Sequence, residues 1–206
     1  MSSIKNLLPY VFQWKSFSEE KRLNFNGYLV CNKNESVIID PPELSKKGLE
    51  ELNLLLSGRN NQPLKAILLT NMHHERSSQK FKNIYSIPIY INEVDAAGLD
   101  IPPDKTFKAG DNLFCGLKAV QLDNQKSLGE TAFFLEAEGL LIVGDALIGK
   151  FPGKVNLLPD EKYKDPEQAK ESLKVLLKLN FNKLLLGDGE SILKNAKSCV
   201  GIFLNS

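Results

Sequence analysis

The chain has 206 residues, of which 42% are hydrophobic and 25% charged, and its formal net charge is +1. These values are ordinary for a soluble globular protein and predict a single domain over residues 1–206. Basic and acidic residues are mixed along the chain, so no basic face indicates a nucleic-acid partner. The composition indicates no oligomeric state.

The cysteines and the N-terminal segment bear on the compartment. Cys31, Cys115 and Cys199 are far apart, odd in number and in no CxxC pair. This pattern argues against a disulfide framework and against a cysteine-rich zinc site. The first 17 residues contain polar side chains where a signal peptide would have an apolar core. The longest other apolar run, residues 139–143, is too short to cross a bilayer. We therefore expect a cytoplasmic protein with no membrane partner.

Strands and helices alternate in the first half of the chain. Residues 37–40 form an expected strand ended by two prolines, and leucines at helical spacing predict a helix over residues 43–58. A strand over residues 65–70 follows, then a helix over 75–85 and a strand over 87–91. Apolar strands separated by helices predict parallel pairing, with the helices on the faces of the sheet.

The second half has a different pattern. Residues 111–122 and 131–135 are expected strands, and a polar turn leads from the latter into residues 140–143, which predicts a hairpin over 131–143. A capping aspartate, Asp165, followed by proline predicts the start of a helix whose apolar face begins at Ala169. A strand over residues 182–186 and a helix over 190–202 complete the expected elements.

Polar clusters directly follow three of these apolar strands. They are Asn71–Arg76, Gly144–Asp145 and Gly187–Gly189, and a fourth polar stretch, Asn124–Glu130, follows the strand that ends at Leu122. Residues just past the carboxyl ends of strands in such a sheet meet in one crevice. The sequence therefore predicts a pocket built from these four loops.

The order and spacing of these clusters resemble the metallo-β-lactamase superfamily over nearly the whole chain. The matching stretches are, in chain order, Ile38–Pro41, Thr70–Arg76, Asn124–Glu130, Gly144–Leu147 and Gly187–Gly189. The resemblance implies an α+β fold, the αβ/βα four-layer sandwich, in which two mixed β-sheets lie face to face with helices on both outer sides. It also implies hydrolysis at two zinc ions.

The metal-ligand positions of the family are mostly occupied by other residue types here. The resemblance maps the ligands of the first metal to Asn71, His73 and Lys126, and those of the second to Glu75, Arg76, Asp145 and Asp188. Arginine and lysine offer no lone pair near neutral pH, and zinc favours nitrogen and sulfur ligands. We therefore expect a dismantled zinc site with no cofactor.

Charge offers a reason for the replacement. Arg76 and Lys126 carry two positive charges and Asp145 and Asp188 two negative ones, so these four side chains can neutralise one another without an ion. The sequence also resembles a degenerate branch of the superfamily with the patterns T-N-x-x-H-x-R, K-[ST]-x-G-E and G-D-G. In that branch the histidine falls at His74, and the glutamate of the second pattern at Glu130.

Several interpretations of these residues remain open. His73 and His74 are either ligands or acid–base groups, or loop histidines oriented by a carboxylate. Glu75, Asp145 and Asp188 are an alternative all-oxygen site for a divalent cation such as magnesium or manganese. Arg76 and Lys126 either bind a small anionic molecule or form a salt-bridge network without a ligand. Residues 150–160 are either a lid over the pocket or a connection.

Three functions follow from these alternatives. The first is a member of the fold that has exchanged its metals for a charge network and binds a small anionic ligand. The second is a hydrolase of a thioester, ester or lactone, with His74 as general base and Asp145 or Asp188 orienting it. The third is an interaction protein that uses an outer surface. RNA cleavage is disfavoured because the metal ligands and a basic stripe are both missing.

Overall fold

Two β-sheets form the centre of the chain in a computed structural model, which describes residues 3–58 and 62–206. The sheets have seven and four strands, in the orders β1-β2-β3-β4-β5-β6-β7 and β11-β10-β9-β8. The strands of the first are β1 (Ile4–Leu8), β2 (Val11–Ser18), β3 (Leu23–Cys31), β4 (Ser36–Ile39), β5 (Leu64–Leu68), β6 (Ile89–Asn92) and β7 (Lys105–Phe107). Those of the second are β8 (Lys118–Gln121), β9 (Thr131–Leu135), β10 (Leu140–Val143) and β11 (Lys183–Leu186).

Both sheets mix parallel and antiparallel pairs. In the first sheet β1 to β4 pair antiparallel, whereas β4 to β7 pair parallel. In the second sheet β8, β9 and β10 pair antiparallel, and β11 lies parallel to β10. The predicted parallel pairing and the predicted hairpin over residues 131–143 are therefore confirmed.

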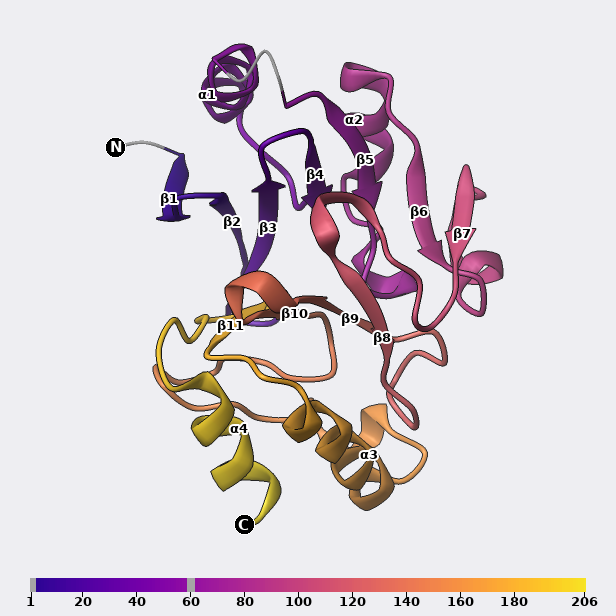
Figure 1. Cartoon of the computed structure of the whole chain (residues 1–206). Coiled ribbons are helices and arrows are strands. Elements are labelled where there is room, and N and C mark those ends of the chain that lie inside the picture. Colours follow the sequence, from indigo (N-terminus) through magenta and orange to yellow (C-terminus); the bar gives the residue numbers. More distant parts are fainter. Residues whose placement is uncertain (1–2, 59–61) are drawn as a thin grey trace.

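The helices lie on the two outer sides. Helices α1 (Lys46–Ser57) and α2 (Ser78–Tyr85) cover the outer face of the first sheet, and α3 (Pro166–Ser172) and α4 (Ala196–Leu204) cover that of the second (Figure 1). The result is the expected four-layer αβ/βα sandwich. No helix within the described ranges is long and apolar enough to cross a membrane.

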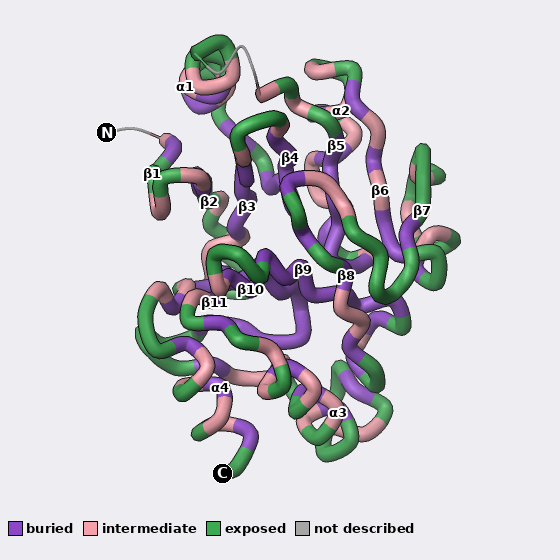
Figure 2. Tube along the Cα trace, viewed as in Figure 1, coloured by how far each residue is buried: buried purple, intermediate pink, exposed green. Residues whose placement is uncertain are grey.

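Burial on both faces explains why the central strands are apolar at nearly every position. Along β3 and β4, Leu29 and Ile38 point towards the helices, whereas Val30 and Val37 point towards the second sheet. In the second sheet Phe133 on β9 points towards the first sheet. The purple segments of Figure 2 mark these buried strands. Alternate side chains thus fill three apolar layers, one between the sheets and one under each pair of helices.

In three of the expected elements that begin later than predicted, a residue with left-handed backbone precedes the observed start. The helix expected over 75–85 is divided by Arg76 (φ 42°), so that α2 begins at Ser78. The strand expected over 111–122 is reduced to β8, because Cys115 (φ 60°) bends the chain before it. The helix expected over 190–202 begins only after Asn195 (φ 56°).

The layer between the sheets should provide much of the stability. Phe133 is fully buried there and packs edge-on against Phe107, with ring centroids 5.7 Å apart. Phe133→Ala should lower the free energy of unfolding by about 3–5 kcal/mol, because it removes the buried ring and leaves a cavity. Phe17→Ala, at a position that is 55% exposed, is the matched control. Urea denaturation of both variants checks this, and equal losses would contradict it.

Candidate functional site

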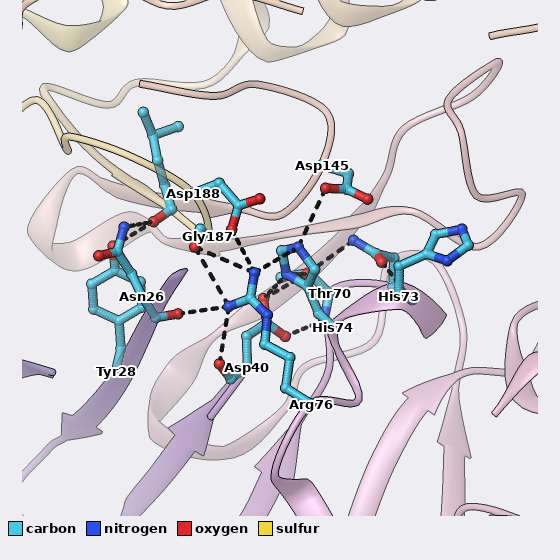
Figure 3. Close-up of polar contacts among 12 residues, drawn as sticks. Asn26, Tyr28, Asp40, Thr70, His73, His74, Arg76, Asp145, Gly187 and Asp188 are labelled. Carbon is cyan, nitrogen blue, oxygen red and sulfur yellow. Dashed lines mark hydrogen bonds and ion pairs between the residues drawn. The ribbon is translucent and has the colours of Figure 1, made fainter. Parts of the chain in front are cut away.

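Loops at the carboxyl ends of four strands converge between the two sheets (Figure 3). Asp40 follows β4, residues 70–76 follow β5, Asp145 follows β10, and Gly187 and Asp188 follow β11. Each pair of strands, β4 with β5 and β10 with β11, is parallel, so their ends face the same side. Three of the four loops predicted to meet here, residues 71–76, 144–145 and 187–189, are among them.

Asp40 orients the ring of His74. Its carboxylate is buried and accepts hydrogen bonds from the Thr70 backbone N–H (2.9 Å) and the Thr70 hydroxyl (2.6 Å). His74 Nδ1 lies 2.8 Å from Asp40 Oδ2, so the Nδ1–H of the ring donates to the carboxylate. In the sequence, Asp40 was identified only as part of the motif Ile38–Pro41 at the end of a strand. Its position just past a buried strand was the signal that could have identified it.

Asp95 joins the two loops that carry His74 and Lys126. The side chain is buried and accepts hydrogen bonds from the backbone N–H of Met72 (3.0 Å) and of Gly129 (2.8 Å), and from the hydroxyl of Ser127. Asp95 was not predicted from the sequence as a site residue. It too follows an apolar strand, β6, at the edge of the sheet where the site lies.

The guanidinium of Arg76 lies at the centre of the site. Its Nη2 donates to Asp188 Oδ1 at 2.5 Å and lies 3.0 Å from His74 Nε2. Its Cζ lies 4.6 Å from the centroid of the Phe25 ring, in cation–π distance. The side chain is only 9% exposed. The left-handed backbone at Arg76 interrupts the helix and directs the side chain inward.

Three backbone carbonyls also accept from Arg76. Nη1 lies 3.1 Å from the oxygen of Asn26, 3.4 Å from that of Asp40 and 3.5 Å from that of Gly187. These carbonyls lie on β3, after β4 and after β11, in both sheets. One side chain therefore ties the strand ends of both sheets together.

Lys126 and Asp145 form a second ion pair. Lys126 Nζ lies 2.7 Å from Asp145 Oδ2, and the two side chains are 26% and 5% exposed. Burial opposes ionisation of Asp145, but its hydrogen bond to His74 and the charges of His74 and Lys126 hold the pKa of its carboxyl well below the usual range. Asp145 is therefore ionised at neutral pH.

His74 is fully enclosed and has charged neighbours on both sides. Burial and the Arg76 guanidinium oppose its protonation, but the carboxylates of Asp40 and Asp145 outweigh them and raise the pKa of His74 to about 10. In the protonated ring, Nε2–H points to Asp145 Oδ1, 3.4 Å away. The 3.0 Å contact with Arg76 would be a hydrogen bond only for an unprotonated Nε2, because arginine has no acceptor.

Glu130 is a buried acid beneath the site. Its Oε1 accepts from the backbone N–H of Ala146 (3.2 Å), and its Oε2 has no hydrogen-bond partner within the described residues. Burial first, and then the charge of Asp145, raise the pKa of Glu130 well above its usual value. The raised pKa favours the neutral form of Glu130.

Asn71 has a structural role, because its side chain caps the turn that carries His74. It is fully buried, and its Oδ1 accepts the backbone N–H of His73 (2.9 Å) at the start of a short 3-10 turn, Met72–His74. A Cβ at Gly144 would lie 2.2 Å from Thr70 Oγ1 and 2.6 Å from Asn71 Nδ2. Glycine is thus required before Asp145 for the two loops to approach each other.

A cavity of about 610 Å³ opens above these groups. Of the nine residues proposed for the pocket from the sequence, six line it: His73, His74, Arg76, Lys126, Asp145 and Asp188. Asn71 and Glu130 lie beneath it. The ring of His73 is directed away from Arg76 and Asp188 (Figure 3), and burial and Lys126 lower its pKa.

Glu75 requires a correction. Its Oε2 accepts the backbone N–H of Asp100 at 2.9 Å, and it does not line the cavity. The left-handed turn at Arg76 places consecutive side chains on opposite sides of the loop, so Glu75 does not join Asp145 and Asp188. Among the described residues, His74 instead joins these two aspartates in a group whose possible ligand atoms lie within 4.8 Å of one another.

Residues 150–160 form one wall of the cavity. Ile148 pairs with Asn156 in an isolated bridge, and the chain from Asn156 to Pro159 lines the cavity together with Lys150. The segment therefore contributes lining side chains in addition to connecting β10 to α3.

Comparison with known proteins supports the fold and the family. The sequence model of the Metallo-beta-lactamase superfamily matches residues 1–203. No curated protein matches the sequence. Among solved structures, a metallo-beta-lactamase from Pontibacter korlensis superposes with a TM-score of 0.77 at 16% identity, covering 100% of this chain and 98% of the other.

Two further solved structures are similar. The DIM-1 metallo-beta-lactamase has a TM-score of 0.73 at 18% identity and covers 97% of each chain. A metallo-beta-lactamase family protein from Thermus thermophilus has a TM-score of 0.70 at 18% identity, over 97% of this chain and 80% of that one. These identities speak for the fold, and the match over residues 1–203 shows the family. The chain belongs to the metallo-beta-lactamase superfamily.

Proposed function

We propose that this chain is a member of the superfamily in which fixed cationic side chains replace the metal ions, and that its cavity binds a small anionic molecule. The position of the Arg76 guanidinium carries the proposal. It lies 2.5 Å from Asp188 Oδ1 and 3.0 Å from His74 Nε2, two of the three groups that could hold an ion. The guanidinium therefore competes with any ion for the same ligand atoms.

Charge balance supports the replacement. Asp40, Asp145 and Asp188 carry three negative charges in a largely buried site. Arg76, Lys126 and a protonated His74 carry three positive ones. Burial of a carboxylate without a cationic partner costs on the order of several kcal/mol of folding free energy. The side chains supply the compensation that metal ions would otherwise provide.

The available donors suit zinc poorly. The group contains one imidazole nitrogen and two carboxylates, whereas zinc favours nitrogen and sulfur. An ion on His74 Nε2 and Asp188 would also lie against the guanidinium, whose charge repels it. The same repulsion weighs against magnesium and manganese.

Hydrolysis of a thioester, ester or lactone finds less support. That reading uses His74 as a general base, and a base must be unprotonated to accept a proton. A pKa near 10 keeps His74 protonated at neutral pH. Asp145 is paired with Lys126 at 2.7 Å and Asp188 with Arg76 at 2.5 Å, so neither is available to activate water. The geometry supports binding over hydrolysis.

Metal analysis tests the proposal directly. Protein purified without added metal, and again after incubation with zinc and dialysis, should contain far less than one equivalent of zinc, iron or manganese by mass spectrometry. The double variant Arg76→His/Lys126→His, which places imidazoles at two of the positions that correspond to metal ligands in the family, should gain zinc. Stoichiometric metal in the unmodified protein would overturn the proposal.

Removal of the central cation should be strongly destabilising. Arg76→Ala leaves Asp188 buried without its cationic partner and removes one donor from three carbonyls, so the free energy of unfolding should fall by about 3–5 kcal/mol. Lys80→Ala is the matched control, because Lys80 pairs with Glu43 at 2.9 Å on the surface. For Lys80→Ala we expect the free energy of unfolding to fall by less than about 1 kcal/mol. Urea denaturation measures both, and an unchanged midpoint for Arg76→Ala would contradict the proposed network.

Arg76→Lys provides a second measurement where the alanine variant does not fold. It keeps the charge and loses the planar fork that reaches both Asp188 and the carbonyls. Stability between those of the unmodified protein and Arg76→Ala is expected.

The two histidines allow a direct test of charge in the site, because the chain has no others. In a nuclear magnetic resonance titration, one imidazole signal should titrate below pH 6.5 and the other near pH 10. His74→Gln should remove the second. Since the pKa of His74 is raised on folding, its contribution to stability is complete below about pH 6.5 and lost as the pH rises towards 10. Titration of both signals below pH 7 would instead indicate a neutral His74 that accepts from Arg76.

A further inference from the structure

The anion site cannot lie on Arg76, although its charge makes it the obvious candidate. Its two terminal nitrogens are engaged by Asp188 and by the carbonyls of Asn26, Asp40 and Gly187. Lys126 is engaged by Asp145 at 2.7 Å. The inner end of the cavity is therefore balanced, and a ligand anion there would compete with aspartates already held in place.

The lysines at the mouth of the cavity are less fully paired with carboxylates than the inner cations are. Lys21, Lys150 and Lys162 line the cavity and come from three separate segments: the turn after β2, the segment after β10, and the short turn Asp160–Lys162. Lys21 pairs with exposed Glu20 at 2.6 Å. Within the described residues, Lys150 and Lys162 form no ion pair, and Glu161 is the acidic residue beside them in the lining. The mouth has an excess of positive charge.

The wall between the mouth and the inner network is apolar. Leu23 and Phe25 contribute from β3, and Ile148, Leu157, Leu158 and Pro159 from the segment after β10. A cavity of about 610 Å³ lies within the range of pockets that hold small organic ligands. Apolar side chains facing such a cavity favour a ligand with an apolar body.

We propose that the cavity takes an amphipathic organic anion whose carboxylate or phosphate is held at the mouth by Lys150 and Lys162 and whose apolar body packs against Leu23, Phe25 and Leu157. Arg76 and Lys126 then form the floor of the site and do not bind the anion. The inference rests on the proposed function, since it assumes that the inner charges remain paired with one another.

Matched naphthalene probes test the proposal by isothermal titration calorimetry. 1-Naphthyl phosphate and 1-naphthoate carry the two anionic heads, 1-naphthol carries neither, and inorganic phosphate lacks the ring. We expect binding of one or both naphthyl anions, with 1-naphthol and inorganic phosphate at least about tenfold weaker. The preferred head distinguishes a phosphate from a carboxylate ligand. Equal binding of 1-naphthol, or no binding of either naphthyl anion, would overturn the proposal.

Charge variants locate the anion. Lys150→Gln/Lys162→Gln should weaken binding of the preferred naphthyl anion about tenfold or more, because charge-assisted contacts are lost. Lys46→Gln/Lys118→Gln makes the same change in net charge at exposed positions outside the cavity lining and should leave it unchanged. Leu23→Gln should weaken the binding of the naphthyl anion and of 1-naphthol to a similar extent. An equal loss of anion binding in the two double lysine variants would show a non-specific charge effect and would refute the placement of the anion at the mouth.

The metal analysis separates this inference from the function on which it rests. Stoichiometric metal together with naphthyl binding that depends on Lys150 and Lys162 would leave the mouth site standing and remove the metal-free interpretation. Absence of metal together with no naphthyl binding would remove the mouth site and leave the metal-free interpretation standing.

Discussion

The ion pair between Arg76 and Asp188 is the contact on which the rest of the site depends. The guanidinium reaches carbonyls on β3, after β4 and after β11, and thereby joins the ends of strands from both sheets. Its backbone is left-handed, a conformation that is unfavourable by about 1–3 kcal/mol for a residue other than glycine. The contacts of the side chain offset this strain. Arg76 therefore combines a strained backbone, contacts with strand ends of both sheets and the neutralisation of Asp188.

Around this pair lies an inner network of carboxylates, in which Asp40 and Asp145 each have an imidazole or cationic partner. Asp40 holds His74 at 2.8 Å, Lys126 holds Asp145 at 2.7 Å, and Asp95 joins the two loops that carry these groups. Glu130, which has no charged partner, keeps a raised pKa and thus avoids a further buried charge. In the metal-free interpretation, this network makes a rigid floor, and recognition takes place above it.

A division between floor and mouth follows from the positions of the cations. The buried cations contact aspartates and carbonyls, whereas the exposed lysines stand at the opening beside an apolar wall. Buried charges of fixed geometry contribute to the shape of a site, and exposed ones attract a ligand from solution. A member of this fold can therefore keep its cavity while the chemistry at its base changes.

The sequence by itself determined the strands with helices on their faces and the loops that carry the polar residues, and the resemblance of its motifs implied the family and the four layers. The strands and loops were accessible because apolar strands are buried on two faces, and because polar residues past such strands lie on one side of the sheet. The three N-terminal strands and β7 were not anticipated. Strands β2 and β3 carry buried polar residues such as Gln13 and Asn26, whose partners Tyr28 and Leu186 lie on other strands.

Only the tertiary structure decided which side chains of the loops enter the site. The left-handed turn at Arg76 sends this residue inward and Glu75 outward, and no periodicity in the sequence signals a turn of that kind. Asp40 and Asp95 acquire their importance from hydrogen bonds to Thr70, His74, Met72 and Gly129, contacts that exist only once separate strands have been aligned. Residue types and spacing set the available charges, and long-range packing selects which of them are paired.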